Sequence, residues 1–437
     1  MTRRSPKQRG FTLVELMISL VMGLIIALAA VGLARSATTT FYEQARVSGV
    51  EANVRAASER FRSDLSRIAY MSTPNIHFDP KLAKIPGAVG VPYRVAVLQD
   101  LQGLRITPAA ATGVNSVRNN ITPHDVFIAG NLTSDDVYRG QFMATGVGCG
   151  GASGAEIRLS GRADAAVRRL FNGETTASRI REMTQLVFMP GERMNPPQAG
   201  FEYVVQVMDM RGCFNYMTIC SVEESAQLDS VLLRLKGDGA RGILTPEDTA
   251  GDVCGARVME EVAIAPVQRV RWYLDADTDT RRIDPATEGP TAQNEKKKIN
   301  LHRQLLDADG VRPIGPPEIV AEYAVDLKLG LLIDSSTTPT TPSTTNIDFE
   351  APQATFDPWV QRATLTIPNI GPQRIRSVRY RLAFRTPLAD RRTDLPMPGG
   401  PPYISRYCVG PDPCTEWARV RTIISEVALL NQAKATY

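Results

Sequence analysis

One apolar run near the N-terminus constrains this chain more than any other feature. The run extends over 23 residues, from Phe11 to Leu33, and Glu15 is its only charged residue. An α-helix rises about 1.5 Å per residue, so a helix of this length would cross the roughly 30 Å hydrocarbon layer of a membrane. Residues 11–34 are therefore predicted to form a single membrane-spanning helix.

The residues before this run form a short basic leader, residues 1–10. Its four bases are Arg3, Arg4, Lys7 and Arg9, and removing them from the 50 basic residues leaves as many bases as the 46 acids. Basic residues beside a membrane helix tend to stay on the cytoplasmic side, so the rest of the chain is expected in the periplasm. A neutral body gives no reason to expect a nucleic-acid partner, because phosphate binding depends on clustered Lys and Arg.

The helix is expected to continue well beyond the apolar run. No proline occurs between Pro6 and Pro74, and apolar residues recur at steps of three and four along one helical face. Residues 35–72 are therefore predicted to be the amphipathic half of one long helix. Three glycines weaken it, and they serve either local stretching or close packing of neighbouring helices. The apolar positions are Val50, Val54, Ala57, Phe61, Leu65 and Ile68, and the glycines are Gly23, Gly32 and Gly49.

Beyond Pro74 the pattern changes to short apolar or alternating runs separated by Gly and Pro, which indicates β-structure. Two low-complexity stretches, residues 278–298 and the Thr/Pro-rich residues 335–346, are predicted to be surface insertions. The predicted strands are 93–99, 125–130, 202–210, 230–236, 267–275, 299–306, 325–333, 362–367, 377–386 and 421–430.

Six cysteines, an even number in a chain with an export-like N-terminus, favour disulfide bonds. Two pairs bracket short segments, Cys213 with Cys220 and Cys408 with Cys414, and the second segment contains turn-forming Gly and Pro. These two bonds would leave Cys149 with Cys254. Six cysteines allow 15 connectivities, so other pairings or reduced thiols stay open as alternatives.

One acidic segment is the best candidate for a ligand site. Asp275, Asp277 and Asp279 have the spacing at which a loop can converge carboxylates on calcium, although Thr280 replaces the glycine of an EF-hand loop. An ordinary solvated acidic turn is the simpler explanation, so no cofactor is expected unless calcium binds. The three histidines are widely spaced and no hydrolase or nucleotide-binding motif occurs, which argues against an enzyme.

The segment RGFTLVEL, residues 9–16, resembles the processing site of type IV prepilins and of type II secretion pseudopilins. The resemblance implies that a membrane peptidase cuts between Gly10 and Phe11 and that the new N-terminus at Phe11 is methylated. It also implies that Glu15 docks on the N-terminal amine of a neighbouring subunit, which would neutralise a carboxylate that is costly at membrane depth. The alternative is a plain membrane anchor in which Glu15 lies at the interface.

The C-terminal half, residues 265–431, and the segment FRSDLSRIAY at 61–70 look like PilW-type minor pilins. This resemblance implies an α+β fold, with the long helix packed on an antiparallel β-sheet head. The head would comprise residues 265–437, and residues 73–264 would form a large β-rich insertion or second lobe.

The resemblance further implies a minor pilin that takes part in assembly of the type IV pilus near its tip, with roles in twitching motility and cell adhesion. Its partners would be other minor pilins, the major pilin, the prepilin peptidase, the inner-membrane assembly platform and the membrane itself. It would span the inner membrane once and later lie in the pilus at the cell surface. A minor pseudopilin of type II secretion and a pilus-tip adhesin are the alternatives.

Overall fold

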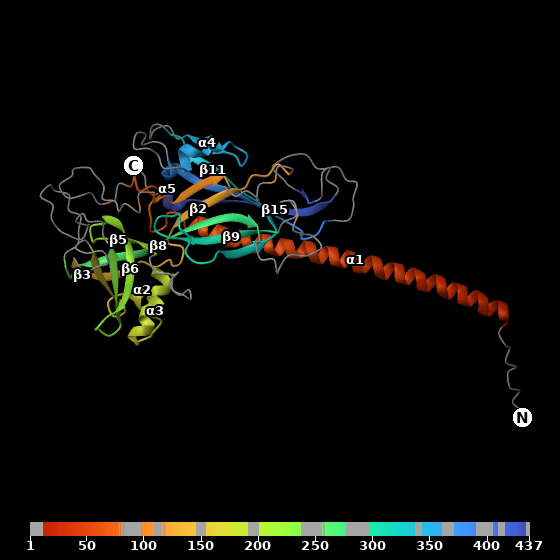
Figure 1. The fold of residues 1–437 in the computed structure, drawn as a ribbon, viewed down its shortest axis with the longest axis horizontal. Helices are drawn as coiled ribbons and strands as arrows, with labels where there is room; N and C mark the ends of the chain where they lie inside the picture. Colours follow the sequence, from red (N-terminus) through yellow and green to blue (C-terminus); the bar gives the residue numbers. More distant parts are fainter. Residues whose placement is uncertain are drawn as a thin grey trace, which may run out of the picture. The chain divides into compact units, whose positions relative to one another are not determined.

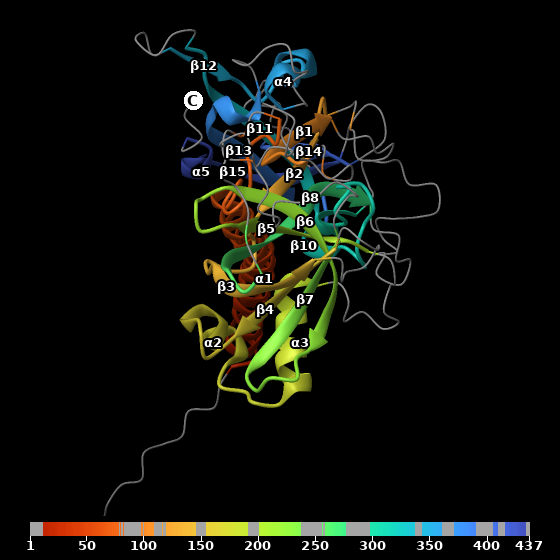
Figure 2. The ribbon, with the colours of Figure 1, turned by 90° about the vertical axis from the view of Figure 1, so that its left-hand side faces the viewer.

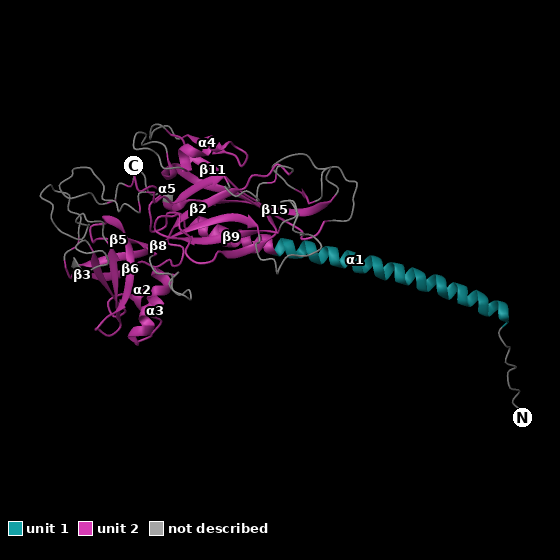
Figure 3. Ribbon diagram, in the orientation of Figure 1, with its two compact units in different colours: residues 1–52 teal, residues 53–437 magenta. Residues whose placement is uncertain are grey.

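A computed structural model describes most of the 437 residues. The described residues are 12–77, 79, 82, 98, 100–108, 116, 119–145, 154–190, 201–236, 256, 258–276, 298–336, 343–360, 371–389, 405–409 and 416–433. The chain divides into two compact units, residues 1–52 and 53–437 (Figure 3), and each is considered by itself.

The long helix is confirmed. Helix α1 extends without interruption over 54 residues, Leu13–Ser66, and it contributes residues to both units. It ends six residues earlier than predicted, because residues 67–71 form a turn in which Ala69 and Met71 have positive φ angles of 56° and 48°. Antiparallel β-sheets follow it, so the predicted α+β class is confirmed (Figure 1).

Six strands of the second unit close into a β-barrel (Figure 2). The strand order is β3-β4-β7-β6-β5-β8, and β8 returns to pair with β3, all in antiparallel register. Closure leaves the barrel without a free sheet edge. The bounds are Tyr138–Thr145 for β3, Ala155–Ser160 for β4, Tyr203–Met208 for β5, Phe214–Glu224 for β6, Ser230–Lys236 for β7 and Glu261–Ala276 for β8.

Apolar side chains fill this barrel because alternate residues of its strands point inward. Strand β4 alternates buried and half-buried residues throughout its length. On β3, Gly140 is required for packing, since a Cβ atom there would lie 2.8 Å from the Ile157 side chain. The core includes Phe142, Ile157, Leu159, Val205, Val207, Ile219, Leu233, Leu235 and Ile264.

Two helices that were not predicted from the sequence pack against the barrel. Helix α2, Ala165–Phe171, is capped by Asp164, whose carboxylate accepts a hydrogen bond from the Ala166 N–H at 3.3 Å. Helix α3, Ala177–Phe188, buries residues at a spacing of four, namely Ile180, Thr184 and Phe188, and it packs on β6 and β7. The middle of the chain is therefore not purely β-structure.

Strand β8 continues out of the barrel into an open sheet. Its residues 261–267 pair within the barrel, whereas residues 268–276 pair with β2, His124–Gly130, and with β9, Ile299–Leu306. Strand β1, Leu104–Pro108, and strand β10, Glu318–Glu322, complete this sheet as the order β1-β2-β8-β9-β10. The domain boundary that we predicted between residues 264 and 265 falls inside β8.

A second sheet has the order β12-β11-β13-β15-β14. Its bounds are Ala324–Asp334 for β11, Thr344–Ile347 for β12, Ile375–Arg385 for β13, Arg406–Cys408 for β14 and Trp417–Ala428 for β15. Short helices border it: α4 at Gln353–Val360, the 3-10 turn η2 at Pro372–Arg374 and α5 at Leu430–Ala433. Strand β11 contacts β2, β8 and β9, so the second sheet lies against the open sheet (Figure 1).

The part of α1 that belongs to the second unit docks on both sheets. The predicted apolar positions Val54, Ala57, Phe61, Leu65 and Ile68 are all buried. The Phe61 ring meets Trp272 of β8 edge-to-face at 4.9 Å and Tyr380 of β13 at 5.3 Å. One aromatic side chain of the helix thus touches a strand from each sheet.

Polar contacts fix the position of this helical segment. The buried carboxylate of Asp64 accepts hydrogen bonds from Trp272 Nε1 at 2.9 Å and from Arg303 Nε at 2.7 Å. The Ser58 hydroxyl lies 2.8 Å from the Tyr380 hydroxyl. A shift of the helix by one residue would break all three contacts and leave buried polar groups unpaired, which costs about 1–3 kcal/mol each.

A group of charges lies on β11 and β13, at the point where β11 contacts β2. Arg381 donates to Asp326 Oδ2 at 2.6 Å and to Glu350 Oε1 at 2.7 Å, and Lys328 also pairs with Glu350. Burial raises the pKa of the Asp326 carboxyl to about 6, although Arg381 opposes the change.

His124 of β2 lies beside these charges. Burial lowers the pKa of His124 to about 4, and nearby Lys328 and Arg381 act in the same direction. His124 is therefore neutral, and its Nδ1 accepts the Leu329 N–H at 3.2 Å.

Eight of the ten predicted strands occur, with bounds shifted by up to six residues. The predicted strands at 93–99 and 362–367 fall almost entirely outside the described residues. Part of the Thr/Pro-rich segment is strand β12, and Lys298, assigned to a surface insertion, is instead buried and paired with Glu322 at 2.8 Å.

Phe61→Ala should destabilise the second unit by roughly 3–5 kcal/mol, because it removes a fully buried ring between two sheets. Denaturant unfolding of the full chain in detergent, followed by Trp fluorescence, would measure the change. Phe41→Ala is the matched control, because Phe41 is 67% exposed and its loss should change little. Equal effects of the two substitutions would contradict the docking contact.

His124→Asn should make the fold less sensitive to mild acid. The unfolded chain protonates His124 below about pH 6.5, whereas the folded chain does so only near pH 4, so acidification favours unfolding across this window. Between pH 7 and pH 5 the unmodified chain should lose about 2 kcal/mol more stability than the variant, in which Asn Oδ1 can still accept the Leu329 N–H. Denaturant titrations at both pH values measure this difference, and parallel losses in both proteins would refute it.

Candidate functional site

The first turn of α1 carries a reciprocal pair of hydrogen bonds between Thr12 and Glu15. The Glu15 N–H donates to Thr12 Oγ1 at 3.3 Å, and the Thr12 N–H donates to Glu15 Oε2 at 3.0 Å. The Thr12 hydroxyl also donates to Glu15 Oε2 at 3.0 Å. This arrangement is a capping box, which satisfies backbone N–H groups that the helix itself leaves without partners.

The capping box gives Glu15 a defined position at the start of the helix. Its carboxylate lies at the positive end of the helix dipole, where a negative charge is favourable. The roles predicted for Glu15 from the sequence, a docking carboxylate or a charge at the membrane interface, did not include this local capping role. The sequence does contain the signal for a capping box, because Thr12 lies three residues before Glu15 at the start of the apolar run.

The helix around this site has an apolar surface that the chain itself does not cover. Large apolar side chains from Leu13 to Leu33 are exposed by 54–77%. By length and composition α1 could cross a membrane, since its most apolar 18-residue window has a mean hydropathy of 2.7 and none of that window is buried. The segment therefore suits a membrane anchor, as the sequence predicted.

Comparison with known proteins agrees with these features. The family model of the prokaryotic N-terminal methylation motif matches residues 5–31, which include the second half of the leader, the capping box and most of the apolar run. The match is consistent with a type IV pilin-like prepilin. No curated protein and no solved structure matches the chain.

The predicted processing residues are Gly10 and Phe11. Both lie outside the described residues, so cleavage and methylation at this bond stay predictions. Thr12 is the first described residue, and the predicted cleavage would place a new amine one residue before it. That amine would be four residues before Glu15 in the sequence.

The calcium prediction has no support among the described residues. Asp277 and Asp279 lie outside them, and Asp275 is an exposed residue of β8 whose Oδ1 accepts the Ala276 N–H. The described part of the chain holds no cluster of His, Cys, Asp and Glu suited to a metal. In the neighbouring turn at 307–310, the Asp307 carboxylate pairs with Arg312, and Asp309 Oδ1 accepts the Val311 and Arg312 N–H groups.

The predicted bond between Cys213 and Cys220 is wrong. Cys213 immediately precedes strand β6, and Cys220 lies within it. Seven residues of extended chain span roughly 20 Å, whereas the Cα atoms of a disulfide lie within about 7 Å of each other. The segment between these cysteines is a strand of the barrel instead of the predicted loop.

The other cysteine pairings stay predictions. Cys149, Cys254 and Cys414 lie outside the described residues, and Cys408 ends strand β14. None of the three described cysteines, Cys213, Cys220 and Cys408, is a free thiol.

Cys213 and Cys220 should be found in two different cross-links. Digestion of the unreduced protein with chymotrypsin can separate them by cleavage at Phe214 or Tyr216, and mass spectrometry would then identify the partner of each. A reduced sample serves as the control. Recovery of a bond that joins Cys213 directly to Cys220 would contradict the extended strand β6.

Proposed function

We propose that this protein is a minor pilin of the PilW type that takes part in initiating assembly of the type IV pilus, near the filament tip. The observation that carries the proposal is the methylation motif at residues 5–31, joined to an exposed apolar helix whose single acid is Glu15. The size of the head supports a role in few copies, because a body of residues 53–437 is bulky for repeated helical packing.

In this proposal Glu15 is the docking residue. A carboxylate within the apolar layer of a filament costs several kcal/mol unless a cation pairs with it, and the Phe11 amine of a neighbouring subunit supplies that cation after cleavage. The capping box with Thr12 holds the carboxylate until the neighbour arrives. Cleavage by the prepilin peptidase would thus create the charge that docking needs.

The proposed partners follow from the same role. They are other minor pilins, the major pilin, the prepilin peptidase and the inner-membrane assembly platform. Before assembly the protein would span the inner membrane once, with the basic leader in the cytoplasm and the head in the periplasm. After assembly it would lie in the pilus at the cell surface, and its role would be structural, without catalysis.

Two alternatives share the N-terminal motif. A minor pseudopilin of type II secretion would use the same cleavage and docking chemistry with different partners. A tip adhesin is favoured by one observation, an open groove of about 220 Å³ beside the barrel. It is lined by Gly161, Arg162, Arg168, Phe171, Gly173, Glu174, Thr175 and Asp229.

Gly10→Ala should leave the leader attached, whereas Glu15→Ala should allow cleavage but impair assembly. Intact-mass analysis of the membrane-extracted protein reports cleavage and methylation, and piliation of cells expressing each variant reports assembly. Thr38→Ala is a suitable control, because it removes a hydroxyl from the same helix outside the motif. Normal piliation with both Gly10→Ala and Glu15→Ala would refute the proposal, and loss of secretion with normal piliation would favour the pseudopilin.

A further inference from the structure

Two charged residues bracket the most apolar part of α1. No charged residue lies between Glu15 and Arg35, and the helix rises by about 30 Å from one to the other. This rise equals the thickness of the hydrocarbon layer of a membrane, which is roughly 30 Å. When Glu15 lies at one edge of that layer, Arg35 therefore lies at the opposite edge, and the residues that follow it enter the headgroup layer.

The segment after Arg35 carries no charge until Glu43. Its three threonine hydroxyls all donate to backbone carbonyls of the preceding turn of the helix. Hydroxyls that are paired inside the helix do not depend on water for a partner, so moving them into a partly dehydrated layer costs less. The three bonds join Thr38 to the Ala34 carbonyl at 2.7 Å, Thr39 to the Ser36 carbonyl at 2.8 Å and Thr40 to the Ser36 carbonyl at 3.0 Å.

Two exposed aromatic side chains end this segment. Phe41 is 67% exposed and Tyr42 is 65% exposed, and their rings meet edge-to-face at 6.2 Å. The described part of the chain therefore leaves most of both rings uncovered. Aromatic side chains are favoured where membrane meets water, because the ring contacts lipid while a hydroxyl such as that of Tyr42 still reaches water.

The spacing along α1 matches the dimensions of a whole bilayer. The helix rises by about 40 Å from Glu15 to Tyr42, and a bilayer with its headgroups measures about 40–45 Å. Arg35 lies seven residues before Tyr42, so the two side chains are on the same side of the helix. Arg35 forms no ion pair with another described residue, and its long side chain can extend the guanidinium group toward lipid phosphates.

We propose that residues 35–42 form an interfacial segment that contacts phospholipid headgroups, with the rings of Phe41 and Tyr42 in the headgroup layer on the side of the membrane opposite the leader. Lipid is the favoured occupant because this segment continues the exposed apolar surface of α1 without a break in the helix (Figure 3). The inference rests on membrane anchoring by α1 and is independent of pilus assembly. The interfacial segment fixes the depth of the helix and so holds Glu15 at the other edge of the hydrocarbon layer.

Depth-dependent fluorescence quenching tests the proposal with the full chain in vesicles of phosphatidylcholine and phosphatidylglycerol. A tryptophan is introduced at one position of α1, and the signal of the three native tryptophans, measured on the unmodified chain, is subtracted. Tyr42→Trp should be quenched at least about twofold more strongly by a nitroxide on the headgroup than by one near the end of the acyl chain, because headgroups lie about 15 Å or more from the bilayer midplane. Phe41→Trp should show the same preference.

Two positions on the same helix are the matched controls. Leu24→Trp, at an exposed apolar position inside the bracketed part of α1, should show the reverse preference. Ala52→Trp, at an exposed position about 15 Å further along the helix than Tyr42, should be quenched weakly by both nitroxides.

The possible outcomes separate the interfacial segment from the membrane anchor. Quenching of Tyr42→Trp as weak as that of Ala52→Trp would overturn the proposal. Protection of Tyr42→Trp from both the headgroup nitroxide and aqueous acrylamide would also overturn it, because another protein surface would then cover the ring. Loss of quenching for Leu24→Trp as well would overturn membrane anchoring by α1 itself.

Discussion

The head is organised around the docking of the second half of α1. Phe61 touches a strand from each of two sheets, and Asp64 accepts hydrogen bonds from Trp272 and Arg303. Apolar burial supplies the larger favourable contribution, because a buried aromatic ring contributes about 3–5 kcal/mol. The buried carboxylate gives less net energy, since its desolvation opposes its pairing, but it admits only one alignment of the helix on the sheets.

The two halves of α1 differ in how their apolar side chains are arranged and buried, although the helix is continuous. From residue 53 onward the apolar side chains form a narrow stripe that is buried in the head. From Leu13 to Leu33 the apolar side chains surround the helix and are exposed, so this segment requires lipid or other helices around it. The capping box at Thr12 and Glu15 begins this segment, where a satisfied helix end matters most because lipid offers no hydrogen bonds.

Much of this architecture could be predicted from local patterns. The long helix, its buried stripe and most strands follow from periodicity that needs no knowledge of distant partners. The barrel could not be predicted in this way, because its closure depends on the pairing of β8 with β3 and β5, which are remote in sequence. The error at Cys213 and Cys220 has the same origin, since a short spacing was interpreted as a loop although tertiary pairing holds the segment as a strand.

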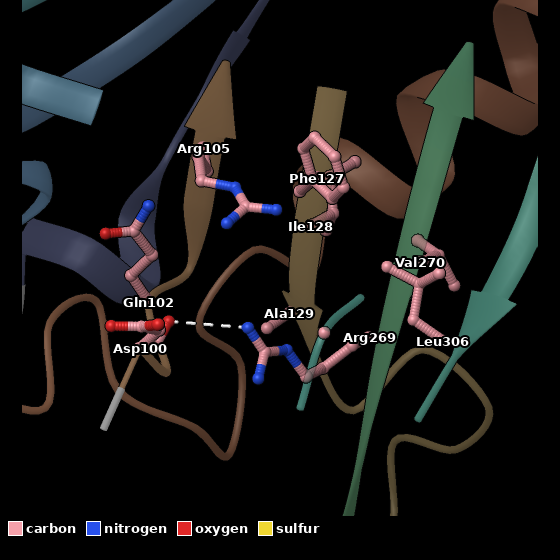
Figure 4. Close-up of a pocket in the computed structure, with 10 residues that line it drawn as sticks. Asp100, Gln102, Arg105, Phe127, Ile128, Ala129, Arg269, Val270 and Leu306 are labelled. Carbon is pink, nitrogen blue, oxygen red and sulfur yellow. Dashed lines mark hydrogen bonds between the residues drawn. The ribbon is translucent and has the colours of Figure 1, made fainter. Parts of the chain in front are cut away.

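Helices α2 and α3 were not predicted, although local patterns alone could have indicated them. Their local signals were readable: Asp164 as a cap, Asn172 before Gly173 at the end of α2, and apolar spacing of four within α3. The arginines of the open sheet illustrate the opposite limit. Arg105 and Arg271 have no distinguishing signal in the sequence, and only the strand register brings both of them beside Phe127, as Figure 4 shows for Arg105.

The shared strand β8 has a mechanical consequence. Its 16 residues belong first to the barrel and then to the open sheet, so no hinge separates the two along this strand. A pull on the barrel along β8 would load the hydrogen bonds to β2 and β9 together, in shear, because these bonds are perpendicular to the strand. Under tension the barrel and the open sheet would therefore move together as one stiff body, and the barrel would not rotate freely about its connection to the sheet.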